Sequence, residues 1–87
     1  MQKKFEQSVN KLKNQVRQMD DSKADVKETM NALIDDLQHQ MDHPDDRDHL
    51  KKLNAKVPDI IAKFELEHPK LAETLNEIMV ILSNMGI

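Results

Sequence analysis

Apolar residues recur every three or four positions along most of this chain. Because an α-helix has about 3.6 residues per turn, this spacing places the apolar side chains on one helix face. Four such stripes follow one another: Phe5, Val9, Leu12, Val16 and Met19; Val26, Met30, Leu33, Leu37 and Met41; Leu50, Leu53, Val57, Ile60 and Phe64; Leu71, Leu75, Ile78, Leu82 and Met85. The pattern predicts four amphipathic helices that share one core.

Short polar segments separate the stripes and predict helices at approximately 2–19, 22–42, 45–67 and 69–85. Ser22 followed by Asp25 resembles a capping box at the start of the second helix. Pro44 suits the first position of the third helix, where a missing N–H has no helical partner to lose. Pro58 lies inside the third stripe, so this helix is expected to be kinked or broken near residues 55–58, with a break slightly favoured.

The predicted fold class is all-α, with residues 1–87 forming a single domain. Few β-branched residues and a single glycine favour helix over sheet. We expect the first two helices to form a hairpin and two shorter helices to pack across it. A chain this small buries a modest core, so dimerisation would complete the resulting small bundle.

Charge is distributed unevenly along a chain whose net charge is −3. Residues 1–19 are basic, whereas residues 20–49 are strongly acidic. The cations beside the first stripe predict a basic face that could contact phosphates; they are Lys3, Lys4, Lys11 and Arg17. No stacking aromatic residue or Gly-rich loop accompanies them. An anion- or nucleic-acid-binding module is therefore the alternative function, and nucleic acid is not the expected partner.

The sequence contains no motif for catalysis or for cofactor binding. Its serines lack a Gly-x-Ser-x-Gly context, and the absence of cysteine excludes disulfides and thiolate metal sites. The longest apolar run, residues 78–82, is far shorter than the roughly 20 residues of a membrane-spanning helix. The first residues also lack the apolar core of a signal peptide. We expect a cytoplasmic protein that is not an enzyme, binds no cofactor and has no membrane span.

Three histidines lie among six aspartates in residues 35–49. His39, His43 and His49 are the candidate metal ligands, because imidazole and carboxylate groups together suit Zn²⁺ or Ni²⁺. The same cluster could act as a pH switch, since imidazole titrates near neutrality. However, the segment has neither an H-E-x-x-H motif nor EF-hand spacing. We therefore expect a solvated helix end that holds no metal.

The last helix is the expected interaction surface. Residues 78–82 cover nearly its whole circumference with apolar side chains, and such a helix must be buried on more than one side. The predicted interface consists of Leu71, Leu75, Ile78, Met79, Ile81, Leu82 and Met85. The favoured function is a non-enzymatic protein-interaction or oligomerisation module, whose partner is a second copy of the chain or an unidentified protein. Gly86 and Ile87 are expected to cap this helix, with Gly86 in a left-handed conformation.

Residues 63–87 read KFELEHPKLAETLNEIMVILSNMGI. This stretch resembles a family of short, uncharacterised bacterial proteins that is classed as a domain of unknown function. Members similarly carry Phe-Glu-x-x-His-Pro-x-Leu and then a helix that ends in Asn-Met-Gly-Ile. The resemblance implies a small all-helical bacterial protein with no established activity, and it supplies no catalytic residues to carry over.

Overall fold

The computed structural model describes the backbone of residues 2–85 and the side chains of residues 3–85. This part of the chain forms four α-helices: α1 (Gln2–Arg17), α2 (Ala24–Asp42), α3 (Arg47–Phe64) and α4 (Pro69–Met85). A single 3₁₀ turn, η1 (Asp21–Lys23), precedes α2. The all-α prediction is confirmed for these residues.

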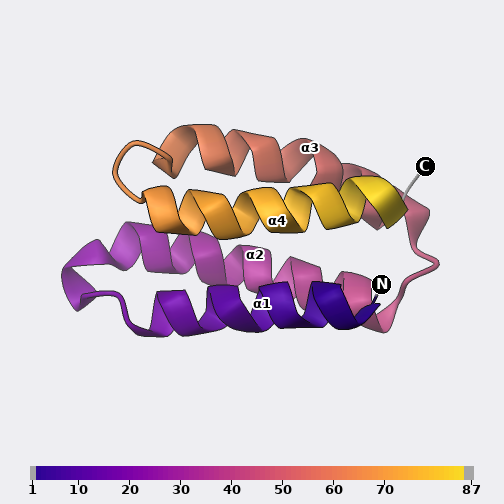
Figure 1. Ribbon diagram of the computed structural model, residues 1–87, viewed down its shortest axis with the longest axis horizontal. Coiled ribbons are helices and arrows are strands. Elements are labelled where there is room, and N and C mark those ends of the chain that lie inside the picture. The colour runs from indigo at the N-terminus through magenta and orange to yellow at the C-terminus, as the bar shows by residue number, and fades with distance from the viewer. Residues whose placement is uncertain (1, 86–87) are drawn as a thin grey trace.

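The helices form an up-and-down bundle in which each is antiparallel to the one that follows (Figure 1). α1 packs against α2 and α4, and α3 packs against α2 and α4, so that α1 and α3 lie diagonally opposite. The predicted hairpin of the first two helices is present. The later helices are not shorter, since α1 to α4 contain 16, 19, 18 and 17 residues. They also lie alongside the hairpin and not across it.

The core consists of the four predicted stripes. Buried side chains from all four helices form one cluster, which includes Phe5, Val9, Leu12, Val26, Met30, Leu33, Leu37, Leu50, Leu53, Val57, Leu71, Leu75, Ile78 and Leu82. Three further side chains widen the stripes, namely Ile34, Ile61 and Ala72. The helices α2, α3 and α4 therefore each bury more than the narrow seam of a coiled coil, as expected for a bundle in which every helix has two neighbours.

Two helix starts differ from the prediction. α2 begins at Ala24, directly after η1. Asp20 and not Ser22 is the capping residue here, and it caps η1: its carboxylate accepts from the Ser22 N–H at 3.4 Å. α3 begins at Arg47 and not near Pro44, with the Asp46 carboxylate accepting from the N–H of His49 at 3.1 Å. An aspartate carboxylate thus caps η1 and α3, whereas α2 continues from η1 without a side-chain cap of its own.

Pro58 does not break the third helix. α3 runs as one helix from Arg47 to Phe64 and ends earlier than the predicted residue 67. Proline removes one backbone donor, but Val57 and Ile60 remain buried in the same phase on either side of it. Burial of this continuous stripe outweighs the single lost hydrogen bond. No helix within residues 2–85 is both long and apolar enough to cross a membrane.

Candidate functional site

A buried glutamine joins the end of α2 to the start of α3. Gln40 has no exposed surface. Its Nε2 donates to the backbone carbonyls of His43 and Asp46, both at 3.4 Å, and its Oε1 accepts from His49 Nδ1 at 2.7 Å. The two backbone carbonyls can accept only from the amide nitrogen of Gln40, so the amide oxygen faces His49. Because that oxygen is an acceptor, His49 carries a proton on Nδ1. Gln40 thus holds residues 43–46 against the helices they connect.

Imidazole rings pack together at this corner. The ring centroid of His39 lies 4.7 Å from that of His43 and 4.4 Å from that of His49. His39 Nε2 donates to Asp46 Oδ2 at 3.1 Å. This hydrogen bond, followed by the one from the backbone N–H of His49, lowers the pKa of Asp46. The carboxylate therefore stays ionised to lower pH, at the positive end of the α3 dipole.

The three candidate metal ligands do not form a coordination site. Among residues 3–85, no group of three or more histidine, aspartate or glutamate side chains is placed to hold a metal ion. His39 Nε2 is bonded to Asp46 and His49 Nδ1 to Gln40, whereas His43 is exposed. The corner is a hydrogen-bonded connection between two helices.

The predicted interface on α4 requires correction. Leu71, Leu75, Ile78 and Leu82 are buried inside the monomer, because α1 and α3 cover that side of the helix. The other three predicted interface residues, Met79, Ile81 and Met85, are partly buried against the core. Val80 was not part of the predicted set, yet it is 55% exposed. Thus one copy of the chain buries most of the apolar circumference of α4.

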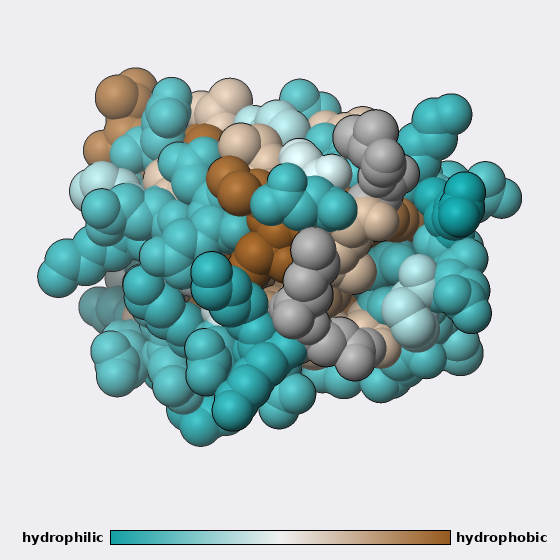
Figure 2. All heavy atoms as spheres, turned by 45° about the vertical axis from the view of Figure 1, so that its right-hand side comes forward, coloured by the Kyte–Doolittle hydropathy of each residue, from teal (hydrophilic) through white to brown (hydrophobic). Residues whose placement is uncertain are grey.

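A groove of about 500 Å³ runs between α1 and α4 on this surface. It is lined by Lys4, Gln7, Ser8 and Lys11 from α1, and by Glu77, Val80 and Ile81 from α4. Lys11 Nζ lies 3.4 Å from Glu77 Oε1 across the groove, and both side chains are about half exposed. In Figure 2 the surface is mostly hydrophilic, and apolar residues gather in a patch near the middle of the face shown. The groove combines exposed apolar surface with two cations and one acid.

The predicted basic face is divided between two sides of α1. Lys4 and Lys11 line the groove towards α4, whereas Arg17 lines a groove towards α2, together with Lys13 and Lys27. The fourth residue of the predicted face, Lys3, is exposed. Because α1 packs against two different helices, its cations do not form one continuous stripe.

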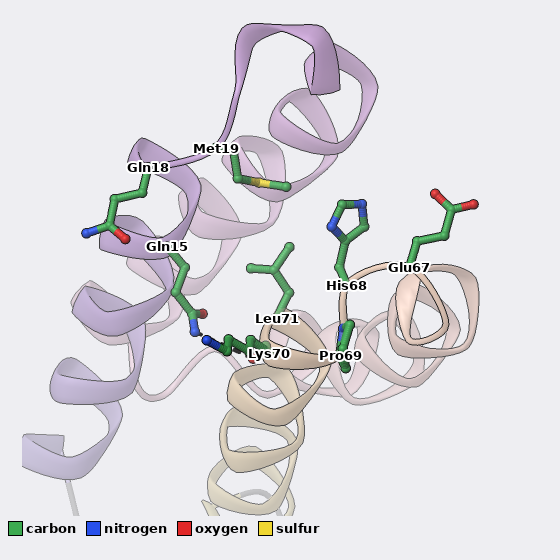
Figure 3. Close-up of a pocket in the computed structure, with 8 residues that line it drawn as sticks. All are labelled: Gln15, Gln18, Met19, Glu67, His68, Pro69, Lys70 and Leu71. Atoms are coloured by element: carbon green, nitrogen blue, oxygen red, sulfur yellow. Dashed lines mark hydrogen bonds between the residues drawn. The ribbon is translucent and has the colours of Figure 1, made fainter.

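A shallow cleft of about 370 Å³ lies at the other end of the bundle from the histidine corner. Figure 3 shows Gln15 and Lys70 pointing towards each other across it, whereas Glu67 extends away. Gln15 Nε2 donates to the Lys70 carbonyl at 3.5 Å. This contact ties the end of α1 to the first turn of α4. The predicted cap residues Gly86 and Ile87 lie outside the described residues.

The family model described as Domain of unknown function (DUF4404) matches residues 5–87. The chain belongs to this family. The predicted membership of a domain of unknown function is confirmed, and the DUF4404 match includes residues from all four helices. No curated protein and no solved structure matches the chain. The DUF4404 description names no activity, so function has to be argued from surfaces.

Two features of this DUF4404 member lie outside the sequence predictions. Gln40 follows Leu33 and Leu37 at core spacing, so its position indicates burial, although the predicted stripe continues to Met41. Lys27 lies outside the predicted basic face, because its proximity to Arg17 depends on how α2 packs. The spacing of apolar residues therefore indicates the burial of Gln40, whereas no sequence pattern indicates that Lys27 lies near Arg17.

Proposed function

We propose that this chain is a non-enzymatic, cytoplasmic protein-interaction module that binds a second copy of itself through the groove between α1 and α4. The observation that carries the proposal is Val80, which is 55% exposed beside the partly buried Ile81. Exposed apolar side chains that adjoin one another at a groove are a feature of association surfaces, whereas isolated ones are common on any surface.

The charges of the groove favour a second copy as the partner. In a two-fold dimer, each contact is made twice with the roles exchanged. A two-fold axis parallel to the helices places α4 of one protomer over α1 of the other. Glu77 then faces the partner's Lys11, and Lys11 faces the partner's Glu77. The two ion pairs form a ring of alternating charge around Val80.

The expected dimer is weak. A stable interface buries about 800 Å² from each partner. The whole monomer has a surface of 5824 Å² and a longest extent of 37 Å, so such an interface would use nearly all of one long face. We expect a dissociation constant in the micromolar range, roughly that of small transient complexes.

Light scattering after size exclusion at about 10 to 500 μM tests the proposal, since the 10.1 kDa chain would approach twice its mass as concentration rises. Val80→Glu should keep the chain monomeric by burying a charge. Leu66→Glu is the matched control, because Leu66 is 93% exposed on the turn between α3 and α4. Monomers at 500 μM would contradict the proposal, as would equal loss of dimer in both variants.

Charge exchange tests the proposed arrangement. Lys11→Glu makes the four facing charges acidic in a homodimer, and Glu77→Lys makes them all basic. Each variant should dimerise poorly alone, whereas an equimolar mixture should form heterodimers through opposite charges. Native mass spectrometry with one variant ¹⁵N-labelled counts the species. If mixing gives no excess of heterodimer while the original chain still dimerises, the arrangement is wrong and another face is used.

The rival function is an anion- or nucleic-acid-binding module that uses the basic face of α1. The division of Lys3, Lys4, Lys11 and Arg17 between two sides of the helix speaks against one continuous phosphate-binding stripe. Salt separates the two functions. An apolar contact at Val80 should largely persist at 0.5 M NaCl, whereas binding to a nucleic-acid backbone should be lost.

A further inference from the structure

A second groove, between α1 and α2, has a different character. It has a volume of about 500 Å³ and is lined by Lys13, Val16, Arg17, Lys27, Asn31 and Ile34. Three of these side chains are cationic and none is acidic. The groove between α1 and α4 includes Glu77, and a neighbouring groove between α1 and α2 includes Glu6 and Asp42. Three positive charges, two on α1 and one on α2, therefore line this groove, and no acid lies in the lining itself.

We propose that this groove binds the phosphate groups of a small di- or triphosphate. Arg17 offers a planar fork of N–H donors, which suits two phosphate oxygens at once. Lys13 and Lys27 lie on either side as mobile point charges, and Asn31 adds an amide donor. Val16 and Ile34 provide an apolar floor, so an anion bound there is partly shielded from water.

The cations can turn towards such a ligand at little cost. Lys27 Nζ lies 3.2 Å from Asp21 Oδ1, but Asp21 is fully exposed, and ion pairs of this kind contribute little. Lys13 Nζ lies 3.5 Å from Gln38 Oε1, a long hydrogen bond to a neutral group. Arg17 has no ion pair with any described side chain. A multivalent anion thus offers each of them a stronger partner.

The surroundings restrict the ligand to a compact anion. Exposed acids lie on α2 and in the turn before it, including Glu28, Asp35, Asp20 and Asp21, and Asp21 pairs with Lys27 of the groove. A long polyanion that left the groove would meet these carboxylates and be repelled. A di- or triphosphate that contacts Lys13, Arg17 and Lys27 meets fewer of these acids than a long strand would, and only Asp21, at Lys27, has to give way to it. This argument favours a small polyphosphate over a nucleic-acid strand.

Titration of inorganic pyrophosphate into the ¹⁵N-labelled chain at constant ionic strength tests the proposal. Amide shifts should saturate at Lys13, Arg17, Lys27 and Asn31. Arg17→Gln and Lys27→Gln should each weaken binding about five- to tenfold, because each removes a charge-assisted contact. Lys52→Gln removes one exposed charge on α3, on another side of the bundle, and should change the affinity less than about twofold. Thermal melting of each variant verifies that the fold is retained.

Three results would overturn the proposal. Chloride or sulfate at the same ionic strength could reproduce the shifts, which would make the groove a general counterion surface. Lys52→Gln could weaken binding as much as Arg17→Gln, which would make the effect one of net charge. A single-stranded RNA oligonucleotide could bind the same residues more tightly than pyrophosphate, which would assign the groove to nucleic acid and refute a compact ligand.

Discussion

The corner around Gln40 makes the sharpest stability prediction. Gln40→Met keeps a side chain of similar length while removing both polar ends. The change leaves the ring N–H of His49 and two backbone carbonyls without their present partner. Because Gln40 has no exposed surface, water cannot readily replace the amide from the Gln40 side. We expect the variant to fold and to be clearly less stable.

The magnitude follows from the three hydrogen bonds. A hydrogen bond contributes roughly 0.5–1.5 kcal/mol net, so the 2.7 Å bond to His49 is counted near the top of that range. The two bonds at 3.4 Å are counted near the bottom. Together they give about 2–2.5 kcal/mol. For a domain of this size, that loss lowers the melting temperature by about 8–20 °C.

Urea unfolding followed by circular dichroism measures this difference, at about 5 μM protein so that self-association does not contribute. Gln38→Met is the matched control on the same helix. Gln38 is only half-buried and makes two long bonds, to Lys13 at 3.5 Å and to Asp42 at 3.4 Å. The control should lie within about 0.5 kcal/mol of the original chain. If Gln40→Met is no less stable than Gln38→Met, the buried hydrogen bonds contribute nothing net and the reasoning fails.

Two further predictions concern α3. The pKa of Asp46 is lowered in the fold, so its stabilising charge is present at neutral pH and is lost as pH falls through that lowered pKa. Urea midpoints of Asp46→Asn should therefore lie below those of the original chain at about pH 5 and converge with them towards about pH 2; a gap independent of pH would contradict this. Pro58→Ala restores a backbone donor to the Asn54 carbonyl and should stabilise the chain by about 2 kcal/mol. An unchanged or lower melting temperature would show that Pro58 is accommodated without loss.

Several features of the fold could be predicted because they depend on local spacing. Stripes such as Phe5, Val9 and Leu12 specify a helical face wherever the helices lie, so the four helices and most of the core followed from periodicity. Helix ends were less accurate. The choice between Ser22 and Asp20 as acceptor, for example, depends on the path of a few turn residues.

The candidate sites depended much more on packing. The sequence placed Arg17 with Lys4 and Lys11, since all lie on α1 near its apolar stripe. The bundle separates them, because α1 packs against α4 on one side and against α2 on the other. The partner that makes Arg17 part of a cationic groove, Lys27, lies ten residues further along the chain on another helix. The spacing of residues within one helix cannot indicate that Arg17 and Lys27 line the same groove.

The sequence by itself determined that this protein is a set of four amphipathic helices, because helical periodicity is a property of near neighbours in the chain. Only the tertiary structure decided how much of α4 remains exposed. Residues 78–82 are apolar around most of the helix, yet α1 and α3 bury Ile78 and Leu82 and leave Val80 as the outward side chain. Which side of an apolar helix faces solvent depends on how many neighbours it acquires, and that number is set by the packing of the whole bundle.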